Sequence, residues 1–98
     1  MPIKRTVVID CHIEDVFEHL AAEVADPSWP RADWDPPRRV AWLTGDGVEV
    51  AYELEAVWTA TRVTRRDATR LGTLRAIARR REVARQLRAL KLELERRG

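Results

Sequence analysis

The side chains with the chemistry of metal ligands or nucleophiles gather near the start of the chain. They are Cys11, His12, Glu14, Asp15 and His19. A zinc signature needs spaced pairs of Cys or His ligands, but Cys11 and His12 are adjacent and the sequence has no second cysteine. A Cys–His nucleophilic pair is also disfavoured, because adjacent residues rarely face each other and no third group is evident to orient the histidine. We expect these residues to cap and cover a helix, and we predict no metal site and no cofactor.

Motifs for other catalytic chemistry are missing from the sequence. There is no Gly-rich phosphate loop, no G-x-S-x-G elbow and no paired-carboxylate motif. The glutamates Glu49, Glu53, Glu55 and Glu93 are expected on solvated faces. We therefore predict no catalytic residue and favour a function other than catalysis.

The run Arg79-Arg80-Arg81 is the strongest candidate for binding phosphate or nucleic acid. Glu82 follows it directly, and the formal net charge of the whole chain is only +2. Such runs usually form the solvated face of a helix. We expect no nucleic-acid partner.

Length and composition limit the remaining classes. The 98 residues predict one domain, residues 1–98, in which an enclosed ligand cavity would take a large share of the core. A single cysteine excludes an internal disulfide. The sequence has neither a secretory signal nor an apolar run of about 18 residues. We expect a cytoplasmic protein without a membrane span.

The first elements follow from a change of hydrophobic period. Residues 3–10 contain the β-branched run Thr6-Val7-Val8-Ile9 and predict a strand. Apolar residues at helical spacing predict a helix over residues 12–25, capped by Asp10 or Cys11. Residues 26–37 contain four prolines, which exclude a regular helix or a central strand. Trp29 and Trp34 in this stretch are expected to fold back on the core, or to line a pocket mouth or an interface.

Three further strands are predicted as consecutive hairpins. They cover residues 38–44, 48–58 and 59–66, with the turn Gly45-Asp46-Gly47 between the first two. Alternation along 48–58 assigns one set of residues to the core face: Val48, Val50, Tyr52, Leu54, Ala56 and Trp58. On the opposite, solvated face we expect weak Glu–Arg pairs across the strands. These would join Glu49, Glu53 and Glu55 to Arg62, Arg65 and Arg66.

The last third of the chain, residues 71–97, predicts a long helix because it lacks proline and is rich in strong helix formers. Val83, Leu87, Leu90 and Leu94 form one apolar stripe. Leu71, Leu74, Ile77 and Ala78 form another, roughly opposite. The stripe changes side at residues 79–82, so the helix is either bent or broken there, or its first part packs on something else, such as a second subunit.

Five segments resemble parts of one family. They are IDCHIEDVFEHL (9–20), DPSW (26–29), PPRRVAW (36–42), TRVT (61–64) and QLRALKLELE (86–95). Together they resemble the START-like, or Bet v 1-like (SRPBCC), superfamily in its polyketide cyclase/dehydrase-like branch. The resemblance implies an α+β fold: a short antiparallel sheet of about four strands in the order first, fourth, third, second, with an N-terminal helix and a long C-terminal helix packed across it. Members of the family usually run about half as long again, with more strands before residues 36–39. Here the sheet is either minimal or completed by a second chain.

The resemblance also implies where a ligand would lie, between the sheet and the long helix. The residues expected to line this site are Val40, Trp42, Val50, Tyr52, Leu54 and Leu87. Plain core packing is the alternative interpretation of the same row. Tyr52 carries the most information, because a buried hydroxyl needs a partner and could orient a carbonyl or hydroxyl group of a ligand.

Three functional hypotheses follow, in order of preference. The first is a non-catalytic START-like module that binds a small hydrophobic molecule of the polyketide or lipid type. The second is a structural or interaction protein that acts as a homodimer. The third is a polyketide cyclase- or dehydratase-like enzyme, placed last because no acid–base pair can be named.

Overall fold

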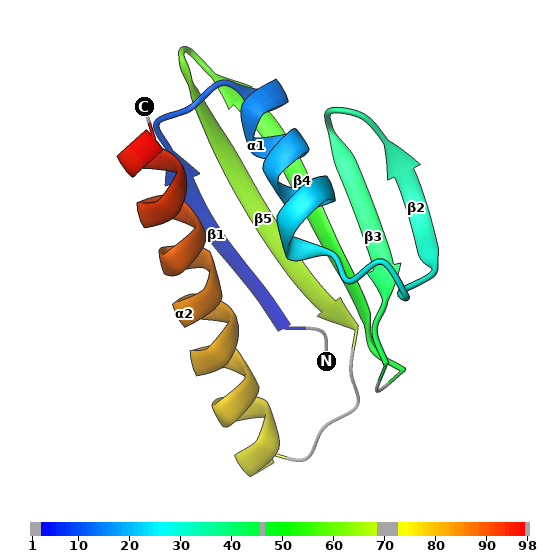
Figure 1. The fold of residues 1–98 in the computed structure, drawn as a ribbon. Helices are drawn as coiled ribbons and strands as arrows, with labels where there is room; N and C mark the ends of the chain where they lie inside the picture. The colour runs from blue at the N-terminus through cyan, green and yellow to red at the C-terminus, as the bar shows by residue number, and fades with distance from the viewer. Residues whose placement is uncertain (1–2, 46, 69–72, 98) are drawn as a thin grey trace.

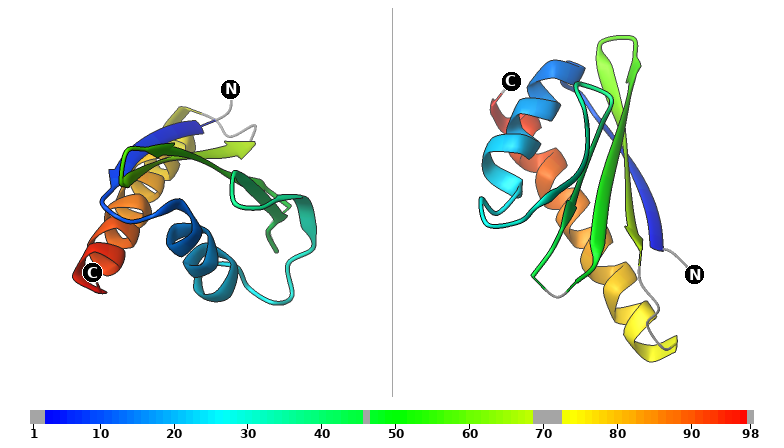
Figure 2. Two further views of the ribbon diagram at one scale, coloured as in Figure 1. Left: turned by 90° about the horizontal axis from the view of Figure 1, so that it is seen from above. Right: turned by 90° about the vertical axis from the view of Figure 1, so that its right-hand side faces the viewer.

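The computed structural model of the protein describes residues 3–45, 47–68 and 73–97. It shows the predicted α+β architecture, an antiparallel sheet with a short and a long helix packed on it (Figure 1). The strands are β1 (Ile3–Ile9), β2 (Arg31–Asp35), β3 (Arg39–Leu43), β4 (Glu49–Val57) and β5 (Ala60–Ala68). The helices are α1 (Ile13–His19), continued by the π-helical turn η1 (Leu20–Val24), and α2 (Thr73–Arg97). Figure 2 shows that the sheet is curved and that both helices lie on its concave side.

The strand order is β1-β5-β4-β3-β2, with every neighbouring pair antiparallel. The first predicted strand lies beside the last, so the expected order is confirmed for these four strands. The predicted turn between β3 and β4 is closed by hydrogen bonds from Thr44 N to Val48 O (2.9 Å) and from Gly47 N to Thr44 O (3.0 Å). Gly47 has a φ of 81°, which glycine adopts without strain. Asp46, the middle residue of that turn, lies outside the described residues.

The sheet has one strand more than the sequence predicted. β2 lies within the proline-rich stretch and pairs with β3, from Asp35 opposite Arg39 to Arg31 opposite Trp42, with a shift of register in between. All its side chains are exposed, so it carries no hydrophobic alternation. No proline lies within β2, since Pro30 precedes it and Pro36 follows it, and the strand lies at the edge of the sheet, where flanking prolines are tolerated.

Alternation along β4 predicted most of the core face correctly. Val50, Tyr52 and Leu54 are buried, but Ala56 is exposed and Trp58 is 99% exposed. Trp58 lies in the turn between β4 and β5 with a φ of 57°, where strand alternation no longer decides which way a side chain points. Its assignment to the core was therefore wrong.

The first helix begins one residue later than predicted. Its N-cap is His12, which makes no side-chain capping hydrogen bond, so neither Asp10 nor Cys11 caps it. Val16, Phe17 and Leu20 bury its apolar face against the sheet. The ring of Trp34, which lies in β2 and not in a loop, meets Phe17 edge-on at a centroid distance of 5.1 Å, while 37% of the residue is exposed.

The long helix α2 is continuous through the residues at which the stripe changes side. Val83, Leu87, Leu90 and Leu94 are buried as predicted. The first turns of α2 extend beyond the end of the sheet (Figure 2), which leaves Leu74 83% exposed. Ile77 (44%) and Ala78 are exposed as well, whereas Leu71 lies outside the described residues. The second stripe is therefore an uncovered surface and not a sign of a break.

The C-terminal end of α2 is held against the end of β1. Lys91 Nζ donates a hydrogen bond to the carbonyl oxygen of Val8 (2.7 Å), and the backbone N–H of Asp10 donates to Glu95 Oε2 (2.9 Å). Within the part of the chain that the structure describes, no helix is long and apolar enough to cross a membrane.

Candidate functional site

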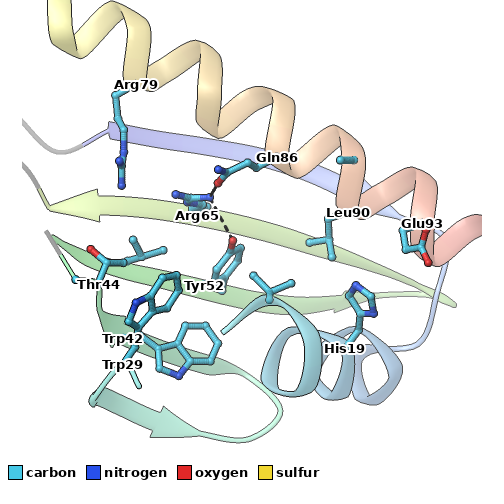
Figure 3. Close-up of a pocket in the computed structure, with 14 residues that line it drawn as sticks. His19, Trp29, Trp42, Thr44, Tyr52, Arg65, Arg79, Gln86, Leu90 and Glu93 are labelled. Carbon is cyan, nitrogen blue, oxygen red and sulfur yellow. Dashed lines mark hydrogen bonds between the residues drawn. The ribbon is translucent and has the colours of Figure 1, made fainter. Parts of the chain in front are cut away.

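A cavity of about 810 Å³ lies between the concave face of the sheet and the two helices (Figure 3). Such a volume lies within the range of roughly 300–1,000 Å³ that small-molecule sites occupy. The sheet contributes Trp42, Val50, Tyr52 and Arg65, with Thr44 and Gly45 at the end of β3. The first helix and the loop after it contribute His19, Val24 and Trp29, and α2 contributes Arg79, Gln86, Ala89, Leu90 and Glu93.

Two tryptophans form the wall of the cavity farther from α2. Trp42 of β3 is 3% exposed and meets the ring of Tyr52 edge-on at 6.2 Å. Trp29 is half-buried and reaches the cavity from the loop after η1. Figure 3 shows both indoles on one side of Tyr52 and the α2 residues on the other. This wall offers a flat apolar surface to a ligand.

The opposite wall carries a buried ionic cluster. Arg65 of β5 is 5% exposed and Asp67 is fully buried. Arg65 Nε donates to Asp67 Oδ1 (2.8 Å), and its terminal nitrogen Nη2 donates to Oδ2 (3.0 Å), so the pair is bidentate. Arg79 Nε of α2 also donates to Asp67 Oδ2 (2.8 Å). One carboxylate therefore holds two guanidinium groups from two different elements.

Tyr52 and Gln86 complete the surroundings of Arg65. Arg65 Nη1 donates to the hydroxyl oxygen of Tyr52 (3.4 Å) and to the side-chain oxygen of Gln86. Burial raises the pKa of Tyr52 above its ordinary value, although the charge of Arg65 opposes the shift. For Arg65, burial alone would lower the pKa, but its bonds to Asp67 and its contacts with Tyr52 raise it overall. Tyr52 is thus a neutral phenol and Arg65 a permanent cation at neutral pH.

His19 is the polar group that the first helix brings to the cavity. Its side chain is almost fully buried, and its Nδ1 atom has no hydrogen-bond partner among the described residues. The nearest carboxylate oxygen, Glu23 Oε2, is 3.6 Å away, which is too far for a hydrogen bond. The imidazole therefore retains hydrogen-bonding capacity.

The structure divides the six residues expected to line the site. Trp42, Val50 and Tyr52 line the cavity. Val40, Leu54 and Leu87 are buried members of the hydrophobic core and are not among the lining residues.

Apart from Tyr52, the polar residues of the cavity were not predicted to line it. Arg65 was expected on the solvated face with Arg62 and Arg66, but it points inward. The signal was available, because Arg65 lies two residues from the buried Val63, whereas it lies one residue from Arg66 and three from Arg62, which places both of these on the opposite face. No such local signal exists for His19 or Gln86, because helix packing alone brings them to the cavity.

The cluster of potential metal ligands near the start of the chain does not converge. No group of three or more His, Cys, Asp or Glu side chains in the described ranges could hold a metal ion. The Cys11 thiol instead donates to the carbonyl oxygen of Leu94 (3.4 Å), and burial, with help from Asp10 and Asp15, raises its pKa. A raised pKa leaves less of the reactive thiolate at neutral pH.

No protein-family model matches this sequence, and no curated protein matches it either. Several solved structures do match it. The solution structure of the Aha1 dimer from Colwellia psychrerythraea aligns with a TM-score of 0.81 and 17% sequence identity, covering 97% of this chain and 96% of that one. The crystal structure of the protein SSP2350 from Staphylococcus saprophyticus aligns with a TM-score of 0.80 and 16% identity, covering 97% and 92%.

This chain has their fold. It is a helix-grip fold of the kind that the START-like resemblance implied, with α2 packed across an antiparallel sheet. At these identities the likeness concerns the fold, and function has to be argued from the site.

Proposed function

We propose that the protein binds a small, mainly apolar molecule of the lipid or polyketide type in the cavity between the sheet and α2, without transforming it. The single observation that carries the proposal is the cavity of about 810 Å³ in a chain of only 98 residues. Small domains bury a modest fraction of their surface, and a packed core would stabilise one better than a cavity of this size. The resemblance to the polyketide cyclase/dehydrase-like branch supports the same class of ligand. A single domain and a cytoplasmic location remain part of the proposal.

A variant that fills the cavity mouth tests this function. Ala89 lines the cavity from the exposed side of α2, so Ala89→Trp adds bulk there without entering the core. Ala78→Trp is the matched control, because Ala78 is also exposed on α2 and is not a lining residue. We expect the neutral fluorophore N-phenylnaphthylamine to bind the wild type and Ala78→Trp, and to bind Ala89→Trp at least about tenfold more weakly. Equal binding to all three proteins would place the dye elsewhere and contradict the proposal.

A second candidate function is self-association, which one surface favours. Leu74 (83% exposed) and Ile77 (44% exposed) lie on the part of α2 that extends beyond the sheet. Exposed apolar groups of this size are often covered by a partner. The Colwellia psychrerythraea protein of the same fold was solved as a dimer.

Light scattering coupled to size exclusion tests this second candidate. We expect a mass of twice 11.3 kDa at micromolar concentration for the wild type, and a shift toward the monomer for Leu74→Glu. Leu92→Glu is the control, since Leu92 is also exposed on α2 (59%) but lies far along the helix from Leu74. A wild-type mass of 11.3 kDa would exclude the homodimer.

A further inference from the structure

Several polar side chains that line the cavity already have hydrogen-bond partners among the described residues. Arg65 donates through Nε and Nη2 to Asp67 and through Nη1 to Gln86. Gln86 accepts that bond through its side-chain oxygen and donates through Nε2 to Glu82 (3.0 Å). Glu93 is paired with two arginines of α2. These groups are therefore satisfied by the protein itself.

The hydroxyl group of Tyr52 is an exception, because only its oxygen is used. That oxygen accepts from Arg65 Nη1 (3.4 Å), and no described residue accepts a hydrogen bond from the hydroxyl proton. Tyr52 is 3% exposed, and burial raises its pKa, so the proton stays in place at neutral pH. A buried donor without an acceptor is destabilising. The phenol therefore offers one hydrogen bond to an acceptor in the cavity.

The imidazole of His19 is the second exception. Its side chain is only 7% exposed, and neither ring nitrogen makes a hydrogen bond with a described residue. The carboxylate of Glu23, 3.6 Å from Nδ1, instead accepts from Arg97 Nη2 (3.1 and 3.2 Å). A neutral imidazole has one N–H donor and one acceptor nitrogen, so a hydroxyl group, which both donates and accepts, matches either tautomer. Because buried polar groups are nearly always hydrogen-bonded, we expect the partner of His19 to come from outside the chain.

These two polar groups lie at different places along the cavity. Tyr52 comes from the middle of β4, and His19 is the last residue of α1. Figure 3 shows His19 toward the end of the cavity where Glu93 lies, and Tyr52 nearer to Trp42. Apolar side chains, Leu90 among them, line the cavity as well. A ligand that reaches both groups must therefore carry two polar functions separated by an apolar body.

We propose that the ligand of this cavity is an oxygenated aromatic molecule, with a carbonyl oxygen that accepts from the Tyr52 hydroxyl and a separate hydroxyl group bonded to the imidazole of His19. This inference rests on the proposed binding function and specifies which polar groups the ligand carries. Planar rings fit against the flat indoles of Trp29 and Trp42. A saturated chain with a single polar end would lack the rings and would leave one of the two polar groups without a partner.

Three naphthalene compounds separate the two contacts. 2-Ethylnaphthalene has the apolar body alone, 2-acetylnaphthalene adds the carbonyl group, and 6-hydroxy-2-acetylnaphthalene adds a hydroxyl group at the opposite end. Equilibrium dialysis would give their dissociation constants with the wild type, Tyr52→Phe and His19→Phe. His12→Phe is the matched control, because His12 is exposed, makes no side-chain capping bond and does not line the cavity. Far-ultraviolet circular dichroism checks that each variant is folded, and His19→Leu replaces His19→Phe should the latter not fold.

We expect Tyr52→Phe to weaken both ketones about fivefold, and His19→Phe to weaken only the hydroxyketone, also about fivefold. 2-Ethylnaphthalene should bind every variant within about twofold of the wild type, and His12→Phe should alter none of the three compounds. If either cavity variant affects all three compounds alike or affects none, the inference fails while the binding function stands. The same holds if N-phenylnaphthylamine binds the wild type and none of the three compounds does. If neither these compounds nor N-phenylnaphthylamine bind, the proposed function fails and the inference fails with it.

Discussion

The two faces of strand β5 use the same residue types in opposite ways. On the outer face, Arg62 pairs with Glu55 (2.8 Å) and Arg66 with Glu53 (3.1 Å), and all four side chains are more than a third exposed. On the inner face, Arg65 pairs with Asp67, at 6% and 0% side-chain exposure. Arg65 and Arg66 are neighbours in sequence, yet one lines a cavity and the other meets water.

The difference shows that the burial of a salt bridge, and not the residue types that form it, decides how strongly the loss of one partner destabilises the fold. An exposed pair gains little, because water and salt screen its charges. A buried pair loses the hydration of both ions, and removal of one partner leaves an uncompensated charge in the interior. The inner pair is thus costly to disrupt. The following experiments test this contrast, from the largest expected effect to the smallest.

Removing the inner carboxylate should have the largest effect. Asp67→Asn keeps the size of the side chain but leaves Arg65 and Arg79 without their shared counter-charge. We expect the free energy of unfolding to fall by about 3–5 kcal/mol. Urea denaturation followed by circular dichroism measures it, because urea, unlike guanidinium, does not screen charges. A loss below about 1 kcal/mol would mean that water screens the inner charges, so that ion pairs on both faces of β5 contribute equally little to stability.

The phenol of Tyr52 on the inner face of the sheet should titrate at a higher pH than an ordinary tyrosine. Tyr52 is the single tyrosine of the chain, so the absorbance of its phenolate reports on one group. We expect its pKa to lie above the ordinary 10.0 in the folded protein and to return to that value in urea. Because the folded state holds this proton more tightly than the unfolded chain does, its contribution to stability is complete below about pH 10 and is lost as the pH rises further. A midpoint at or below 10 in the folded protein would contradict the burial of this site.

Removing a carboxylate from the outer face should have the smallest effect. Glu55→Gln is the same acid-to-amide change as Asp67→Asn, made on an exposed partner of Arg62. We expect a loss of only about 0.2–1 kcal/mol in urea denaturation, decreasing as salt is added. If Glu55→Gln and Asp67→Asn cost the same, the contrast between the faces does not hold.

The regular elements could be predicted because their patterns are local. A period of two along β4 and a stripe of helical spacing in α2 predicted which residues are buried, including Val50, Leu54, Val83 and Leu87. The exceptions occur where a strand ends in a turn or where a helix extends beyond the sheet that would cover it. Trp58 lies in a turn with positive φ, and Leu74 lies on a turn of α2 that the sheet does not reach.

The candidate site could be predicted only in its apolar part. Trp42, Val50 and Tyr52 belong to the hydrophobic alternation, so sequence reasoning included them. The period of two also places Arg65 on the inner face, although arginine is rarely buried and the prediction grouped Arg65 with Arg62 and Arg66 on the solvated face. The strand β2 was missed for a similar reason, since an exposed edge strand shows no alternation to detect.

The sequence by itself determined the fold of this protein, because hydrophobic periodicity is a property of neighbouring residues and fixes which face of each element is buried. The tertiary structure alone decided the chemistry of the cavity. Arg65 of β5, Arg79 of α2 and His19 of α1 come from three different elements, and no local pattern relates them. Their charges and hydrogen bonds interact strongly only because packing removes them from water and brings them to one cavity.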